Sequence, residues 1–364
     1  MLSFALAGCA VGPDYAPPKT ELTPFHNLSG STSKDRPVPP LDRWWVGFHD
    51  PKLVTVVQRA LDQNLDLAAA MARVSQARAG VAGAKADLLP TADLNVSSTY
   101  EHQSLYSQFG SVAKNGPGFY RDGREENVGP SASWELDLFG GLRRGVKEAQ
   151  DEAQAAEADQ VGTRITVAAD TADAYFQIRG YQARLAVAED QISTDEHLLQ
   201  LVHDRLDAGV ATQREVAQAD ALLKQARAIV PPLRLGLEQQ MNRLDVLMGA
   251  QPGTYARELA STSDIAPVPP IPGNLEPADL LRRRPDIIAA ERRLAGSNEQ
   301  IGVAIAEYYP KISLSAALGL DSLKDGRLFT GDALQAIGAG ALRWRLFDFG
   351  KVDSEVGQAR GRQR

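Results

Sequence analysis

The sequence predicts a mainly α-helical fold with a smaller β component, built from long antiparallel helical hairpins and four short strands. Three observations carry this prediction. Residues 142–206 contain no proline and keep small or apolar residues in steps of three, four and seven, which is typical of a long helix packed along a seam. Four stretches alternate polar and apolar residues with a period of two. The order helix, strand, loop, strand occurs twice, which indicates an internal duplication.

The composition limits the class of protein. The chain has 364 residues and a formal net charge of −7. Its charges are dispersed, whereas a nucleic-acid-binding protein normally has a basic face, so we expect no nucleic acid as a partner. No apolar run approaches the roughly 18 residues of a membrane-spanning helix, which excludes a helical membrane protein but not a barrel of half-apolar strands. The histidines are scattered, and no P-loop, dinucleotide turn or Ser/His/Asp arrangement is visible. We therefore expect no catalytic residue, no metal and no cofactor.

The N-terminal part holds the single cysteine, Cys9, at the end of Leu6-Ala7-Gly8-Cys9. A small-residue tripeptide before cysteine resembles the lipobox of bacterial lipoproteins, which implies cleavage before Cys9 and lipidation of that residue. A cysteine that is buried by chance is the alternative. On the lipoprotein hypothesis, residues 1–8 are a partial signal peptide. Residues 9–49 are a lipid-anchored tether, because they are rich in proline, serine and threonine.

Residues 50–260 form the first repeat. Asp50 and Pro51 suit the N-cap and the first position of a helix. Pro90 ends the helical pattern that follows, because proline cannot continue a helix. Alternation then predicts two strands joined by a polar loop, at residues 91–100 and 129–138.

A long helical hairpin, residues 142–249, completes the first repeat. At 1.5 Å per residue, its first helix is a rod roughly 95 Å long, which must lie against other helices. Gly209 suits the left-handed residue that ends a helix, and Thr212 and Glu215 suit a capping box that starts the next one. Pro231-Pro232 should kink the second helix or break a hydrogen bond in it. The turn between the helices is a candidate site: Asp207, Gly209, Thr212 and Glu215.

The pattern starts again after a linker at 261–276. Pro310 repeats Pro90 at an offset of 220, and Trp344 repeats Trp134 at an offset of 210. The second repeat, residues 277–364, is thus predicted to hold strands at 311–320 and 337–346. It then has only the first turns of a second hairpin. We therefore expect a C-terminally truncated chain, which as written aggregates or is degraded.

Four strands of about ten residues suit a membrane barrel, with apolar faces toward lipid and polar faces toward a watery lumen. Four strands cannot close a barrel, because about eight are needed, so copies of the chain must share one. Two soluble hairpins packed on helices would alternate in the same way and remain the alternative. On the barrel hypothesis the candidate lumen-facing residues are Asp93, Asn95, Glu135, Asp137, Lys311, Arg343 and Arg345.

Part of the second repeat carries a family resemblance. The segment from Leu280 to Ile287, with Arg284-Pro285-Asp286 at its centre, and Tyr308-Tyr309-Pro310 after it, resembles the signature of TolC-like outer-membrane efflux proteins. Trp44-Trp45 and Asp50-Pro51 are similar to the N-terminal motif of their lipoprotein branch, the OprM- and NodT-like proteins. The resemblance implies long hairpins that form an α-barrel, and a homotrimer whose four strands per protomer form a shared 12-stranded β-barrel.

The family motif itself is expected to be structural. Proline suits a first helical position, and aspartate suits the first turn of a helix, near its positive end. A run of arginines would also suit an anionic ligand, but ion pairs or a solvated helix start explain it more simply. The motif residues are Arg284, Pro285, Asp286 and Pro310.

The implied function is that of the exit duct of a tripartite efflux pump, which passes small molecules such as drugs from the periplasm to the exterior of a Gram-negative bacterium. The implied partners are a periplasmic membrane-fusion adaptor, an inner-membrane pump and outer-membrane lipid, and the hairpin turn is expected to be the periplasmic tip that meets the adaptor. Three alternatives stay open: a periplasmic coiled-coil adaptor, an outer-membrane duct for type I protein secretion, and an enzyme on a helical scaffold. The family's gate lies largely on the second hairpin, so no gate residue is assigned.

Overall fold

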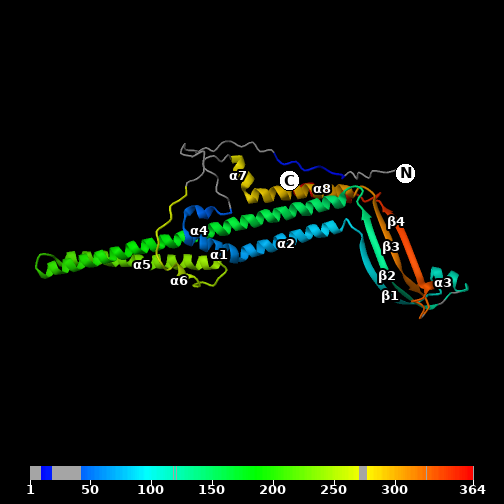
Figure 1. Cartoon of the computed structure of the whole chain (residues 1–364), viewed down its shortest axis with the longest axis horizontal. Helices are drawn as coiled ribbons and strands as arrows, with labels where there is room; N and C mark the ends of the chain where they lie inside the picture. The colour runs from blue at the N-terminus through cyan, green and yellow to red at the C-terminus, as the bar shows by residue number, and fades with distance from the viewer. Residues whose placement is uncertain are drawn as a thin grey trace. The chain divides into compact units, whose positions relative to one another are not determined.

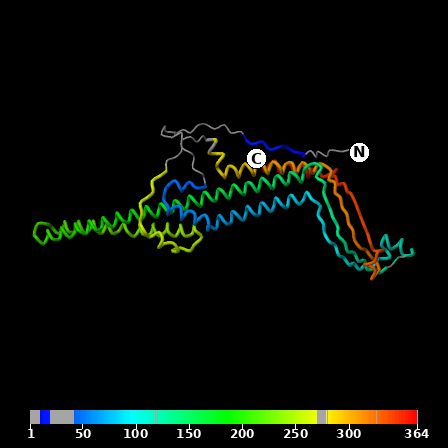
Figure 2. The backbone as a smooth tube through the Cα atoms, in the orientation of Figure 1, coloured from blue at the N-terminus to red at the C-terminus, as the bar shows by residue number. Residues whose placement is uncertain are grey.

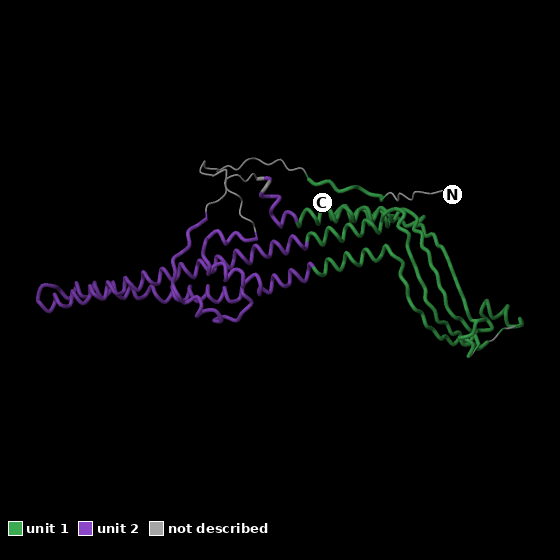
Figure 3. The backbone as a smooth tube through the Cα atoms, in the orientation of Figure 1, with its two compact units in different colours: residues 1–19, 75–155, 289–364 green, residues 20–74, 156–288 purple. Residues whose placement is uncertain are grey.

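A computed structural model of the chain describes residues 10–18, 42–117, 119, 121–269, 277–324 and 326–363. The expected signal peptide, Cys9 and most of the tether lie outside these residues. The chain forms two compact units, which Figure 3 distinguishes by colour. Unit 1 comprises residues 1–19, 75–155 and 289–364, and unit 2 comprises residues 20–74 and 156–288. Within the described ranges, no helix combines the length and the apolarity needed to cross a membrane.

Unit 1 contains a four-stranded antiparallel sheet in the order β1-β2-β3-β4 (Figure 1). The register pairs odd-numbered residues with odd-numbered residues, as in Asp93 with Ser131 and Lys311 with Arg343. The alternation in the sequence therefore produces two distinct faces, and the odd-numbered residues of all four strands share one of them. The strands are β1 Thr91–His102, β2 Asp122–Leu136, β3 Lys311–Ser322 and β4 Leu334–Arg343.

All four strands differ from the expected boundaries: β1 and β3 each end two residues later, β2 ends two residues earlier, and the largest differences are the start of β2 and the position of β4. β2 begins at Asp122 instead of residue 129, because polar residues extend its pairing with β1 as far as His102, whose imidazole contacts the Asp122 carboxylate. β4 covers residues 334–343 instead of 337–346. Its partner strand β3 begins directly after Pro310, which has no N–H to donate, so the pairing stops there.

The helices are long in both units. They are α1 Pro51–Gln63, α2 Leu65–Ala86, α4 Gly141–Asp207, α5 Gln213–Leu247, α7 Pro277–Arg283, α8 Pro285–Ala306 and α9 Lys351–Gln363. Shorter elements are η1 Trp44–Phe48, α3 Gln108–Ala113, α6 Ala256–Leu259 and η2 Gly331–Ala333. α3 lies in the connection that was expected to be an irregular loop. α5 continues through Pro231 and Pro232, which remove two backbone donors without ending the helix.

The duplication extends to single side chains. α2 and α8 both contain 22 residues, and α8 begins at the offset of 220 found in the sequence. The indole N–H of Trp134 donates to the carbonyl oxygen of Leu88, and that of Trp344 donates to the carbonyl oxygen of Tyr308, both at 2.9 Å. Each tryptophan therefore joins the end of one strand to the helix–strand turn before the neighbouring strand.

The main buried cluster lies in unit 2, where α1 packs with parts of α4 and α5. Leu53, Val57 and Leu244 are completely buried there. The Asp50 carboxylate accepts the backbone N–H groups of Lys52 and Leu53, so the predicted N-cap is confirmed. The same carboxylate accepts the hydroxyl of the buried Tyr175 at 2.7 Å. One side chain thus starts α1 and fixes it to α4.

We expect Asp50→Ala to lower the free energy of unfolding by about 2–4 kcal/mol, because it removes the cap and leaves a buried hydroxyl without an acceptor. Thermal denaturation followed by circular dichroism measures the loss. Asp62→Ala is the matched control, because the Asp62 carboxylate accepts an exposed hydrogen bond from Gln58. The control should change stability by less than about 0.5 kcal/mol. Equal losses in the two variants would contradict this role of Asp50.

Candidate functional site

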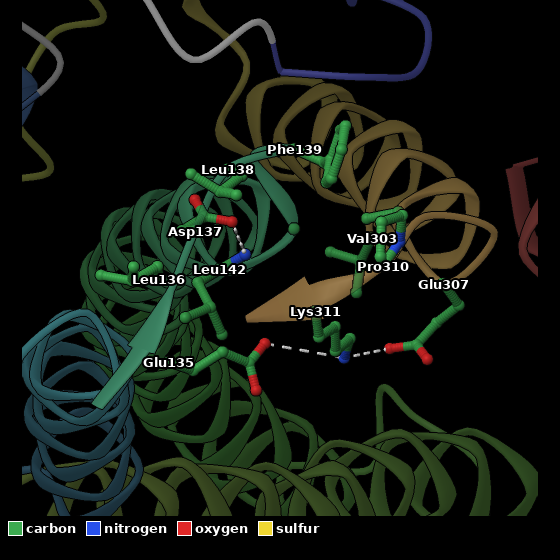
Figure 4. Close-up of a pocket in the computed structure, with 12 residues that line it drawn as sticks. Glu135, Leu136, Asp137, Leu138, Phe139, Leu142, Val303, Glu307, Pro310 and Lys311 are labelled. Carbon is green, nitrogen blue, oxygen red and sulfur yellow. Dashed lines mark hydrogen bonds and ion pairs between the residues drawn. The ribbon is translucent and has the colours of Figure 1, made fainter. Parts of the chain in front are cut away.

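A chain of five charged side chains lies in unit 1, where the sheet meets the helices. The Lys311 ammonium contacts the carboxylate of Glu307 and lies 3.8 Å from that of Glu135. The Arg345 guanidinium lies 3.0 Å from Glu307 and 3.6 Å from Glu355. The signs therefore alternate along the chain, so each charge has a neighbour of opposite sign. Figure 4 shows Glu135, Lys311 and Glu307 in line. We call these five residues the junction network.

A small cavity of about 80 Å³ opens beside the junction network (Figure 4). Leu136, Leu142 and Val303 line it with apolar surface, while Glu135 and Lys311 add charge. Ligand pockets usually measure roughly 300–1,000 Å³, so this cavity is too small for a drug-sized molecule. Among the described residues, no group of three or more His, Cys, Asp or Glu side chains is placed to hold a metal ion. The site therefore presents alternating charges to its surroundings beside a small, partly apolar cavity.

Five of the seven candidate lumen residues share one face of the sheet. Each of the five is odd-numbered, and the register therefore places them together: Asp93, Asn95, Glu135, Lys311 and Arg343. The other two, Asp137 and Arg345, lie beyond the ends of β2 and β4. Their assignment to a strand face was wrong, because the alternation of polar residues continues past the last paired residue of each strand.

Asp137 lies between β2 and α4 and caps the first turn of that helix. Its carboxylate accepts the backbone N–H groups of Leu142 and Arg143 at 3.1 and 3.0 Å, and the Arg143 guanidinium binds it at 2.9 Å. Asp348 does the same for α9 by accepting the N–H groups of Gly350 and Val352. These backbone donors hold the pKa of Asp348 below its usual value. A carboxylate a few residues before a helix is a known capping signal, so Asp137 and Asp348 could have been predicted as caps from the sequence.

Several important residues at this junction were missed. Glu307 joins Lys311 to Arg345, and Glu355 extends the network into α9. Glu307 lies four residues before Lys311, a spacing that would have suggested an ion pair within a continuous helix. Nothing in the local sequence predicts the contact between Arg345 and Glu307, because the two residues are brought together by strand pairing.

The hairpin turn of unit 2 has the predicted local geometry. Gly209 has φ +75°, and its N–H donates to the Leu206 carbonyl, while the Val210 N–H donates to the Arg205 carbonyl. This pair of bonds is the Schellman motif, which needs a left-handed residue at the glycine position. Thr212 and Glu215 then cap each other across the first turn of α5. Both local predictions are confirmed, and the turn follows Asp207, the last residue of α4.

The two charged residues of the Arg284-Pro285-Asp286 motif form an ion pair with each other. Pro285 is the first residue of α8, and the Arg284 guanidinium binds the Asp286 carboxylate at 2.6 Å. The arginine holds the pKa of Asp286 below its usual value. Because the two charges neutralise each other, the motif fits a helix start better than an anion-binding site. Pro310, the fourth motif residue, directly precedes β3.

Comparison with known proteins gives consistent matches over most of the chain. The model of the family described as outer membrane efflux protein matches residues 56–250 and 277–364. Nodulation protein T of Rhizobium leguminosarum bv. trifolii is 32% identical over 319 residues, which cover 87% of this chain and 65% of that protein. Pyoverdine export outer membrane protein OpmQ of Pseudomonas aeruginosa is 32% identical over 321 residues, 88% of this chain and 66% of that protein. The chain therefore spans slightly less than two thirds of these relatives.

A solved structure agrees with the sequence matches. The outer-membrane channel OprN is similar with a TM-score of 0.86 at 32% identity, covering 98% of this chain and 77% of that chain.

We expect the capping box of α5 to weaken in acid. The Thr212 N–H and hydroxyl donate to Glu215 and hold the pKa of its carboxyl below the ordinary value. A lowered folded-state pKa means that the stabilisation is present above the ordinary pKa and is lost as the pH falls through the lowered one. Hydrogen exchange at Thr212–Val216, corrected for intrinsic rates, should lose protection as the pH falls below the ordinary pKa of a glutamate carboxyl. Glu215→Gln should show no such dependence, and the same dependence in this control would contradict the assignment.

Proposed function

Because the chain belongs to the outer membrane efflux protein family, we propose that it acts as the exit duct of a tripartite efflux pump in the outer membrane of a Gram-negative bacterium. Three copies are proposed to share one 12-stranded β-barrel, with four strands from each. The observation that supports this proposal most strongly is that the four-stranded sheet is open at both edges. β1 and β4 are its outer strands, and every residue along both is exposed. Four strands cannot close a barrel, and an open edge invites pairing with another chain.

The two faces of the sheet suit a barrel wall. The face with Asp93, Glu135 and Lys311 is proposed to line the aqueous lumen. The opposite face exposes large apolar side chains, which suit contact with lipid. These are Leu94, Val96, Tyr100, Leu314, Leu318 and Leu342.

The long helices suit an α-barrel that extends into the periplasm. α4 and α5 form an antiparallel hairpin whose outward side chains remain partly apolar, which favours further helices as neighbours. The exposed apolar residues include Val187, Leu198, Leu201, Leu222, Ile229 and Leu235. The hairpin turn is proposed as the periplasmic tip that meets a membrane-fusion adaptor, which in turn binds an inner-membrane pump.

Small molecules are the proposed cargo. The names of the relatives refer to different compounds, among them pyoverdine and toluene. We therefore infer only that the cargo is a small molecule and assign no single compound. Lipid attachment at Cys9, the single cysteine of the chain, is proposed as the membrane anchor.

The experiment that tests the proposal combines location and transport. The protein should fractionate with the outer membrane and be extracted by detergent, and its deletion should raise the intracellular level of a pump substrate. A salt-washable periplasmic pool would favour an adaptor instead. Loss of a secreted protein with normal small-molecule efflux would favour type I secretion. Either result would contradict the proposed duct.

We expect Gly209→Val to reduce efflux while the protein remains at normal levels in the membrane. A β-branched residue at φ +75° costs about 1–2 kcal/mol and distorts the turn that is proposed to meet the adaptor. Gly253→Val is the matched control, because Gly253 also has positive φ and open space around its Cα but lies outside the turn. The intracellular accumulation of a pump substrate is measured in both variants, and it should rise in Gly209→Val but not in Gly253→Val. Equal efflux in the two variants would argue against the tip assignment.

We expect Arg343→Gln to shift the channel toward cation selectivity, because it removes a positive charge from the proposed lumen face in every protomer. The reversal potential in a planar bilayer under a salt gradient measures the shift. Arg257→Gln, in α6 of unit 2, is the control for a loss of charge outside the sheet. An unchanged reversal potential in Arg343→Gln would place this face away from the lumen.

A further inference from the structure

The N-terminal segment of the described chain is bound to unit 1 by specific contacts. We call residues 10–15 the strap. In Figure 2 its blue trace runs alongside α8. The Val11 N–H donates to the carbonyl oxygen of Phe139 at 3.0 Å, in the turn that leads from β2 to α4. The carbonyl oxygen of Pro13 accepts from both Arg144 and Asn298, at 3.1 and 2.9 Å. One strap carbonyl therefore joins α4 to α8.

Arg144 is the centre of this contact. Its side chain is 2% exposed, and its guanidinium donates to the carbonyl oxygens of Gly12 and Pro13 and to the Asp14 carboxylate. Its remaining acceptor is Glu299, itself buried, at 2.8 Å. Without the strap, the guanidinium would keep one of its four acceptors, Glu299, and water would have to replace the other three.

Two glycines make the close approach possible. A Cβ added to Gly12 would lie 2.6 Å from the Cα of Gly302, and Gly12 also has φ +100°, which a side chain would strain. A Cβ added to Gly302 would lie 2.9 Å from the Arg144 side chain and 3.1 Å from the Val11 carbonyl oxygen. The two backbones thus touch where any side chain would separate them.

We propose that the surface formed by Arg144 of α4 and by Asn298 and Gly302 of α8 is a binding site for the chain's own N-terminal strap. Arg144 recognises the strap chiefly through its backbone carbonyls, and the bound strap holds α4 and α8 together at the junction with the sheet. Recognition through backbone carbonyls requires glycine at position 12, where the two backbones touch, and the Asp14 carboxylate adds one side-chain contact. A planar guanidinium reaches Gly12, Pro13 and Glu299 together, which the single ammonium of lysine cannot do in that geometry.

The test is hydrogen exchange of the detergent-extracted protein, read by mass spectrometry in peptides that contain Val11. Gly302→Ala should raise the exchange rate of the Val11 amide by about tenfold or more, because the new methyl group displaces the strap. Gly296→Ala is the matched control on the same helix, since its Cβ would meet Asp151 at an ordinary 3.5 Å. It should leave the strap protected as in the wild type.

Two further variants keep the proposal falsifiable. Gly12→Ala changes the strap and leaves the sequences of both helices unchanged. Arg144→Lys keeps the positive charge but removes the planar set of N–H donors that reaches several acceptors at once. Both should expose the Val11 amide while peptides from the unit 2 core around Tyr175 stay protected, which shows that the protein is folded. The proposal is wrong if the Val11 amide exchanges at the rate of a free peptide in the wild type, or equally slowly in Gly302→Ala and Gly296→Ala. Because no transport is measured, these results are independent of the proposed duct function.

Discussion

The backbone of an open four-stranded sheet cannot satisfy its own hydrogen-bonding groups, and the rest of the structure depends on this constraint. β2 and β3 are paired on both sides, whereas β1 and β4 are paired on one side only within the described chain. In water such an edge aggregates, and in lipid each unpaired group is costly. A barrel shared by several copies pairs every edge. In such a barrel the polar odd-numbered face would border the lumen, and the apolar opposite face would border the membrane.

The junction between sheet and helices is built twice from the same chemistry. Trp134 and Trp344 bind turn carbonyls, and Asp137 and Asp348 cap the helices that follow. Asp137 and Asp348 do not occupy equivalent positions in the two repeats. The residues whose N–H groups they accept do correspond, because Leu142 in the first repeat matches Val352 in the second. Each helix must begin where the sheet pairing stops, so its orphan N–H groups need an acceptor at that point. The junction network and the strap stabilise the same region with charge.

The sequence predicted features that depend on a few neighbouring residues. Gly209 and the capping box of Thr212 with Glu215 are of this kind, and so is the alternation that defines the sheet faces. The strand ends were not predictable in this way, because the end of β4 is decided by Pro310, which precedes the partner strand β3. Asp137 was assigned wrongly because a period of two does not reveal where pairing stops. The contact of Gly12 with Gly302 joins residues that are distant in the sequence, and no local pattern signals it.

The central claim, that copies of the chain close a barrel by pairing β1 of one with β4 of the next, is tested most directly by disulfide crosslinking in outer membranes. One cysteine would replace Leu94, Val96 or Ser98 of β1, and a second would replace Ala336, Ile337 or Gly338 of β4. Within one chain these strands are separated by β2 and β3, too far apart for a disulfide. The account predicts crosslinked dimers and trimers on non-reducing gels that single-cysteine variants do not form. Monomers alone, for every pair, would contradict it.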